Sequence, residues 1–249
     1  MVSEQSEAGG FQAGGRAWDP ARPDIERLLA ISTCTRLRPI YYGSNHCFLV
    51  TLDAGDEGES FAVYKPRSGE YPLYDFPHGT LYRREICSYL VDKILGWSLV
   101  PPTVRADFDY GAGSVQLFIE EAEHETVSVA ELRRLALLDI LINNADRKVD
   151  HCLVDGAGKV WGIDHGLTFN VQPKLRTVLW HFAGSEIPAD EADDVRRLSQ
   201  CLQRPHSDAE RIRELISPAE WKALRERVDR IGEYRRFPDP RYKPVPYRW

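Results

Sequence analysis

The sequence has 249 residues, of which 43% are hydrophobic and 28% charged, and its formal net charge is −6. This composition is ordinary for a globular protein of one large domain or two lobes, and the acidic balance argues against a protein that binds nucleic acid. The five cysteines form no CxxC pair, and no apolar run approaches the length of a transmembrane segment or follows a signal-peptide pattern, so we expect a cytoplasmic protein without a zinc knuckle or a disulfide framework.

The predicted elements of the first half are mainly strands. Residues 1–22 are rich in Gly, Ser, Glu, Gln and Ala, which predicts a disordered tail. A short helix is expected at residues 25–31. Apolar runs between turn residues then predict three strands, at residues 36–42, 46–52 and 60–65. In the third strand Phe61, Val63 and Lys65 share one face, because side chains alternate along a strand.

A longer helix is expected at residues 81–96. Ile86, Leu90 and Ile94 recur at every fourth position, and Gly96 supplies a stop. Glu85 lies beside this apolar stripe. After two prolines, segments 103–110 and 114–120 are expected to form a hairpin around the glycines at 111 and 113.

The polar segment 120–128 is expected to separate two lobes. The predicted divisions of the chain are a tail at 1–22, a β-rich N-lobe at 23–122, a C-lobe at 123–236 and a C-terminal tail at 237–249. The C-lobe begins with a helix over 128–144, for which Ser128 and Glu131 have the spacing of a capping box. This helix is apolar nearly all round except at Asp139, so we expect it to be buried with Asp139 as a structural anchor.

Chemistry-bearing side chains are concentrated after this helix. The loop NADRKVDH (144–151) leads into two short predicted strands at 151–155 and 159–164, joined by a glycine turn. The pairs Asp150-His151 and Asp164-His165 thus stand at opposite ends of one hairpin, which is expected to bring them close together. Two amphipathic helices are predicted further on, at residues 189–203 and 217–236.

The order of these parts matches what phosphoryl transfer from a nucleotide requires. A lysine binds the phosphates, a glutamate holds that lysine extended, an aspartate positions the acceptor hydroxyl, and further ligands hold metal ions against the phosphates. Lys65, Glu85, Asp146 and Asp164 occur in that order on the expected elements. Taken singly, each of these residues is as well explained by a solvated surface position.

Several segments resemble phosphatidylinositol 3-/4-kinase-like proteins, and most closely type II phosphatidylinositol 4-kinases and uncharacterised bacterial relatives. The segments are GSN (43–45), VYKPRSGEYP (63–72), YRREICSYLVDKILG (82–96), NADRKVDH (144–151) and GIDHGLTF (162–169). The resemblance implies an α+β, two-lobed protein-kinase-like fold, with a small β-rich N-lobe and a mostly helical C-lobe that carries a catalytic β-hairpin. It also implies an ATP-dependent phosphotransferase that uses Mg²⁺ or Mn²⁺ and acts on a hydroxyl of a protein or small molecule.

The resemblance assigns roles by position. Asp146 is expected to be the catalytic aspartate, with Lys148 as a candidate to touch the transferred phosphate, and Asp164 is expected to bind metal. Lys65 and Glu85 are expected to form the ion pair that sets the phosphates. The remaining nucleotide contacts fall on the phosphate-covering loop and on the hinge beside the adenine: Gly43, Ser44, Asn45, Gln116, Phe118 and Glu120.

The sequence departs from the family at one metal ligand. His151 stands where the family has an asparagine, and imidazole suits softer ions than Mg²⁺, so we expect a preference for Mn²⁺ or a site with one metal. Asp150 is expected to orient His151, as carboxylates that contact ligating histidines do. His165 is expected to be a packing or hydrogen-bonding residue.

Two alternatives stay open at this point. A catalytically impaired pseudokinase, acting as a nucleotide-binding or regulatory module, would account for His151 and for the single glycine in the phosphate-covering loop. A metal-dependent hydrolase built on the Asp-His pairs would need a metal site independent of nucleotide, and it leaves Lys65 and Glu85 without a role. The sequence does not identify the phosphate acceptor.

Overall fold

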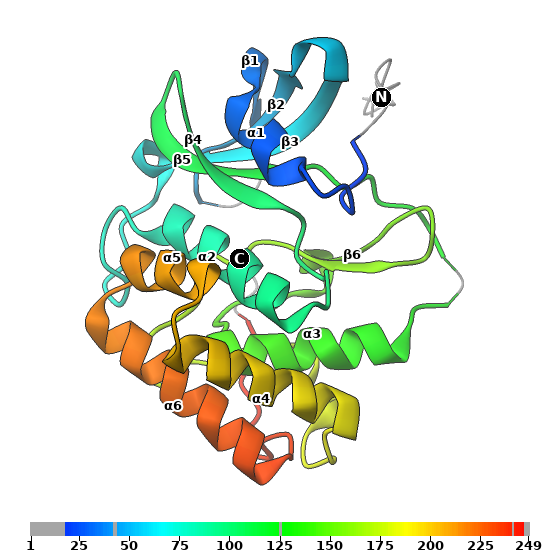
Figure 1. The fold of residues 1–249 in the computed structure, drawn as a ribbon, viewed down its shortest axis with the longest axis vertical. Helices are drawn as coiled ribbons and strands as arrows, with labels where there is room; N and C mark the ends of the chain where they lie inside the picture. The colour runs from blue at the N-terminus through cyan, green and yellow to red at the C-terminus, as the bar shows by residue number, and fades with distance from the viewer. Residues whose placement is uncertain (1–17, 42–43, 125, 241, 247–249) are drawn as a thin grey trace, which may run out of the picture.

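The computed structural model describes residues 18–41, 44–124, 126–240 and 242–246. An antiparallel sheet forms one end of the molecule and a group of helices forms the other, as Figure 1 shows. The sheet has the strand order β1-β2-β3-β5-β4. Its strands are β1 (Thr33–Ile40), β2 (Cys47–Asp53), β3 (Glu59–Pro66), β4 (Thr103–Phe108) and β5 (Gly111–Leu117).

The helices and a second, small sheet make up the rest of the structure. The helices are α1 (Ile25–Ile31), α2 (Leu81–Leu95), α3 (Val129–Ile142), α4 (Ala189–Gln203), α5 (Ser207–Leu215) and α6 (Pro218–Tyr234). The hairpin of β6 (Cys152–Val154) and β7 (Val160–Gly162) follows α3. None of the described helices has the length and apolar character that a membrane span requires.

One hydrophobic core lies between α1 and one face of the five-stranded sheet. Alternate residues of β2 and β3, such as Val50 and Ala62, are fully buried there. Trp18 joins this core with 5% of its surface exposed, and its backbone N–H donates to the hydroxyl of Ser60. Trp18 was expected in the tail, but it is ordered because burial of the indole offsets the entropy of ordering; residues 1–17 of the predicted tail lie outside the described residues.

The other face of β3 is directed toward the helical half. Phe61, Val63 and Lys65 are partly exposed, while their neighbours on the strand are buried, which confirms that the three side chains share a face. Lys65 is therefore presented between the sheet and the helices.

The turn between β4 and β5 lies earlier in the chain than the expected position around residues 111–113. Asp109 and Tyr110 form the turn, and the glycines from position 111 onward belong to β5. Gly113 serves strand packing, because an added Cβ would lie 2.5 Å from the carbonyl oxygen of Lys65 and 2.6 Å from the ring of Tyr64. A glycine inside a strand often marks such a close approach of another backbone.

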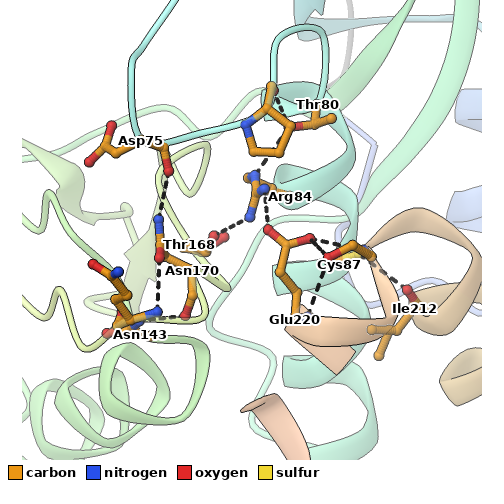
Figure 2. Close-up of polar contacts among 12 residues, drawn as sticks. Asp75, Thr80, Arg84, Cys87, Asn143, Thr168, Asn170, Ile212 and Glu220 are labelled. Carbon is orange, nitrogen blue, oxygen red and sulfur yellow. Dashed lines mark hydrogen bonds and ion pairs between the residues drawn. The ribbon is translucent and has the colours of Figure 1, made fainter. Parts of the chain in front are cut away.

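Helix α2 packs mainly against the helical half. Its buried residues, including Ile86 and Leu90, belong to the same core as those of α3, α4 and α6. Arg84 is 1% exposed; it donates to the carbonyl oxygen of Thr168 and forms an ion pair with Glu220 on α6, as Figure 2 shows. Helix α2 is thus fixed to the C-terminal helices by a buried charge pair as well as by apolar packing.

The helix caps follow the expected chemistry only in part. Ser128 caps α3 by accepting from the N–H of Glu131, but the Glu131 carboxylate accepts from Val160 N–H instead of completing a capping box. A complete capping box is present at α6, between Ser217 and Glu220. Helix α4 covers the predicted range 189–203, whereas α5 was not predicted.

The described part of the C-terminal tail is packed against the helices. Phe237 is 4% exposed, and the carbonyl oxygen of Pro244 accepts from the N–H of Thr177 and from the indole of Trp180. These contacts attach Phe237 and Pro244 of the C-terminal segment to the helical half, while most of the described residues between and around them are exposed.

Candidate active site

Lys65 lies at the centre of the candidate site. Its Nζ atom is 2.5 Å from Oε1 of Glu85 on α2 and 2.8 Å from Oδ1 of Asp164, which follows β7. The Glu85 side chain is 3% exposed, whereas that of Asp164 is 48% exposed. The structure therefore brings together three of the predicted site residues from the sheet, a helix and a hairpin.

The electrostatics of this cluster favour a charged lysine. Burial opposes the charge on Lys65, but the carboxylates of Asp164 and Glu85 outweigh it and raise the pKa of the ammonium. Burial raises the pKa of Asp164 in turn, but Lys65 and His151 outweigh it and hold that pKa below its usual value. Burial raises the pKa of Glu85, although Lys65 opposes this.

The hairpin brings His151 and Asp164 together, as predicted. Nε2 of His151 is 3.4 Å from Oδ2 of Asp164, and Asp164 has a left-handed backbone with φ of 57°. Nδ1 of His151 is 2.9 Å from the carbonyl oxygen of Asp146. A carbonyl only accepts, so Nδ1 carries a proton, and Nε2 is the ring nitrogen directed toward Asp164. The backbone carbonyl of Asp146 thus orients His151, and the orienting role expected for Asp150 stays a prediction.

Asp146 and Lys148 lie together in the loop before the hairpin. Their side chains form an ion pair of 3.0 Å, and that of Asp146 is 18% exposed. Burial raises the pKa of the Asp146 carboxyl, and Lys148 opposes this shift. The N–H of Asp146 donates to the side chain of Asn144, which holds the carboxylate at a fixed place in the loop.

Arg147 organises the loop from inside. Its side chain is fully buried and donates to both oxygens of Asp139 on α3. It also donates to the carbonyl oxygens of His151 and Ile163, each at 2.9 Å. One guanidinium thereby ties both ends of the hairpin to α3. Asp139 is thus a structural anchor, as expected, and it acts through the side chains of Arg147 and Asn144.

His165 connects this loop to Glu85. Nε2 of His165 accepts from Arg147, because a guanidinium only donates, and the distance is 2.6 Å. The backbone N–H of His165 donates to Oε2 of Glu85 at 2.9 Å. Burial and Arg147 lower the pKa of His165 well below its usual value, which keeps the ring neutral. His165 is thus a hydrogen-bonding residue, as expected.

The predicted nucleotide-contacting residues lie in the loop between β1 and β2, in β5 and directly after β5. Ser44 and Asn45 lie in the loop between β1 and β2, and Asn45 accepts from the N–H of Tyr71; Gly43 lies outside the described residues. Gln116 is inside β5, where it pairs with Val63 and Thr103.

Two groups of the predicted hinge are engaged within the sheet. The N–H of Phe118 donates to the carbonyl oxygen of Phe61, so it is engaged within the sheet. The side chain of Gln116 is buried and donates to Thr103. The hinge role of the segment from Gln116 to Glu120 stays a prediction, and Glu120 is exposed.

His151 and Asp164 fit a divalent metal ion. Two ligand atoms about 2.1 Å from one octahedral ion lie about 3 Å apart, which is close to the separation of His151 Nε2 and Asp164 Oδ2. The hydrogen bond on Nδ1 is the kind that orients ligating histidines. Within the described ranges, no group of three or more His, Cys, Asp or Glu residues is arranged to hold a metal ion. A hydrolytic metal centre with three protein ligands therefore finds no support there.

The chain is similar in sequence to a mycobacterial protein. It is 36% identical over 268 residues to Protein Rv2133c of Mycobacterium tuberculosis, and the alignment covers 91% of this chain and 95% of that protein. The chain belongs to the same family as Rv2133c. No protein-family model matches it.

Solved structures with a similar fold are kinases. The Golgi casein kinase with Mn/ADP bound has a TM-score of 0.57 at 14% identity, covering 88% of this chain and 80% of the other. A structure of hydra Fam20 with sugar has a TM-score of 0.56 at 14% identity, covering 84% and 86%. At this identity the likeness concerns the fold, which is the predicted α+β, two-lobed kinase-like fold. The finer resemblance to type II phosphatidylinositol 4-kinases stays a prediction.

Proposed function

We propose that the protein is an ATP-dependent phosphotransferase that acts on a hydroxyl of a protein or small molecule. The observation that carries the proposal is the position of Lys65 Nζ, in contact with both Glu85 and Asp164. A strand lysine paired with a helix glutamate, and an aspartate that holds metal, must both be in place for a kinase to act. Lys65, Glu85 and Asp164 lie in one cluster, as this proposal requires.

Each residue has a distinct part in the proposed transfer. Lys65 would neutralise the phosphates, and Glu85 would hold its ammonium in the extended position. Asp146 would orient the acceptor hydroxyl and accept its proton, with Lys148 alongside. A divalent ion, held by Asp164 and His151, would supply charge neutralisation at the phosphates when bound. Phosphoryl transfer depends mainly on positioning and on charge neutralisation, so residues of these types would be sufficient for it.

The kinase-like fold supports the proposal. The structure of the Golgi casein kinase carries Mn/ADP, and the present chain shares its fold. Imidazole is a better ligand for Mn²⁺ than for Mg²⁺, so His151 is consistent with a preference for Mn²⁺. The resemblance to phosphatidylinositol 3-/4-kinase-like proteins supplies the residue roles but does not determine the acceptor.

The second candidate is a pseudokinase that binds nucleotide without transfer. His151 favours it, because it replaces the asparagine that serves as a metal ligand in the family. Metal-dependent transfer of the γ-phosphoryl group separates the two candidates, since a pseudokinase would bind nucleotide and release it unchanged.

Calorimetric titration of ATP into the purified protein first tests nucleotide binding, which both candidate functions require. Titrations with Mg²⁺, with Mn²⁺ and with EDTA should show micromolar-range binding that depends on metal. An absence of binding in all three conditions would contradict the kinase function. Single-turnover assays with labelled ATP and a panel of hydroxyl acceptors then separate active transfer from binding alone.

A further inference from the structure

A pocket in the helical half is separate from the Lys65 cluster. Its volume is about 640 Å³, and it lies between the end of α3, the segment that follows Asp164, α6 and the C-terminal segment. Neither Lys65, Glu85 nor Asp164 lines it. The lining residues that matter here are Asn143, Arg176, Trp180, Arg227, Arg230 and Tyr242.

The walls of this pocket are held by hydrogen bonds within the protein. The Asn143 amide donates to the carbonyl oxygens of Asn170 and Gln172, and its oxygen accepts from the N–H of Lys174. Figure 2 shows Asn143 beside Asn170, whose own amide reaches the backbone of Asp75. These bonds hold the pocket open in the free protein, which is the usual state of ligand sites.

Arg227 gives the pocket a partly buried positive charge, and no carboxylate in the described part of the chain forms an ion pair with it. Its Nε donates to the carbonyl oxygen of Leu141 at 3.1 Å, and its Nη1 donates to that of Asn170 at 3.3 Å. Its Nη2 is shielded from solvent and has no hydrogen-bond partner within the described residues. Burial and the neighbouring Arg230 lower the pKa of Arg227 to about 10. A guanidinium that is partly desolvated without a carboxylate partner is unfavourable, and an anion in the pocket would supply the missing negative charge.

The remaining lining adds further positive charge and apolar surface. Arg176 and Arg230 line the pocket along with Arg227, whereas Glu226 is the one acidic residue among the described lining residues. Ile140 and Trp180 contribute apolar walls, with several prolines of the C-terminal segment. Guanidinium groups bind phosphate and carboxylate through paired hydrogen bonds, and apolar walls accommodate a hydrocarbon body.

We propose that this pocket binds a small organic anion, with its phosphate or carboxylate on Arg227 and Arg230 and its apolar part against Trp180. This goes beyond the kinase function, since the site uses other residues. It also adjoins the catalytic loop, because the backbone of Arg176 accepts from the N–H of Arg147 and donates to the carbonyl oxygen of Asn144. An anion in the pocket would therefore stabilise the backbone on both sides of Asp146.

Binding of defined probes to the full-length protein tests this proposal. Phenyl phosphate, phenylacetate and the uncharged benzyl alcohol are titrated by calorimetry. The two charged probes should bind and benzyl alcohol should not. The charged probe that binds more tightly shows whether the pocket prefers a phosphate or a carboxylate. The substitution Arg230→Met should weaken that binding about tenfold, since a hydrogen bond to a charged group is lost. Arg230 is exposed, so its replacement should not disturb folding.

Two control variants test whether the loss of probe binding is specific to the pocket. Arg213→Met removes an exposed arginine of α5 that does not line the pocket, and should leave probe binding unchanged. Lys65→Met alters the nucleotide site, and should also leave probe binding unchanged. The proposal is overturned if no charged probe binds, if Arg230→Met and Arg213→Met behave alike, or if Lys65→Met removes probe binding. Loss of ATP binding with probe binding intact would count against the kinase function alone.

Discussion

The guanidinium of Arg84 contacts the carboxylate of Glu220 at 2.5 Å, across 136 positions of the sequence. Their side chains are 1% and 7% exposed, so the pair is removed from water. Glu220 also belongs to the capping box of α6, and Arg84 precedes Glu85 on α2. The contact therefore fixes the helix that presents Glu85 to Lys65, and it links the stability of the helical half to the geometry of the site.

Breaking this pair should destabilise the protein. Arg84→Met leaves Glu220 buried without its partner, so we expect the free energy of unfolding to fall by about 3 kcal/mol in urea titrations. The double variant Arg84→Met/Glu220→Leu removes both charges and should recover more than half of that loss. Arg83→Met changes the adjacent, partly exposed arginine and serves as the control. Equal losses of unfolding free energy in Arg84→Met and Arg83→Met would show that the buried pair contributes no more to stability than the partly exposed Arg83 does.

Lys65 should determine nucleotide affinity. Lys65→Met removes the ammonium that faces Glu85 and Asp164, so we expect ATP binding to weaken by about tenfold or more in the calorimetric titration. Lys222→Met, at an exposed position of α6, is the matched control and should bind ATP as the wild type does. Unchanged affinity in Lys65→Met would remove the assigned role of this lysine.

Asp146 should matter for transfer and little for binding. Asp146→Asn keeps the shape of the side chain but removes the base, so transfer in a single-turnover assay should fall by about a hundredfold or more. ATP affinity should stay near that of the wild type. Asp150→Asn neutralises an exposed acid in the same loop and should transfer normally. If Asp146→Asn retains full transfer, the proton acceptor is another group.

His151 should influence the choice of metal. His151→Asn replaces the imidazole nitrogen that lies 3.4 Å from Asp164 with an amide oxygen, which Mg²⁺ prefers. We expect the ratio of ATP affinities with Mn²⁺ and Mg²⁺ to shift toward Mg²⁺. His181→Asn, an exposed substitution, should leave the ratio unchanged. A ratio that does not move in His151→Asn would exclude this histidine as a ligand.

Asp92 on α2 should make stability depend on pH. It is buried, and burial raises the pKa of its carboxyl to about 7, although the N–H groups of Leu99 and Val100 oppose this shift. The folded state therefore holds a proton that the unfolded state has lost above about pH 4. The resulting stabilisation is complete below that pH, and it is lost as the pH rises toward 7.

The measurement compares the wild type with Asp92→Asn, which cannot titrate. From pH 5 to pH 7 the free energy of unfolding of the wild type should fall by about 2 kcal/mol relative to the variant. Urea titrations at several pH values measure this difference. A difference that is constant across the range would show that Asp92 is ionised throughout in the folded protein.

The local features of the fold were largely predictable. The helix over residues 189–203 and the shared face of Phe61, Val63 and Lys65 follow from periodicity, which neighbouring residues set among themselves. Gly113 shows where this reasoning fails: its neighbours suggested a turn, but the constraint is the close approach of β3. The unpredicted α5 and the buried Trp18 likewise depend on partners far away in the chain.

The sequence by itself determined which residue types are available for the site, their order, and the strand, helix and hairpin that carry them. Only the tertiary structure decided that Arg147 joins α3 to both ends of the hairpin and that Arg84 meets Glu220. It also decided that Arg227 lies partly buried beside a pocket, with no ion-pair partner among the described residues. Periodicity and capping act over a few residues, so they appear in the sequence. The pairing or isolation of a buried charge depends on how distant elements pack, and that is settled only when the chain folds.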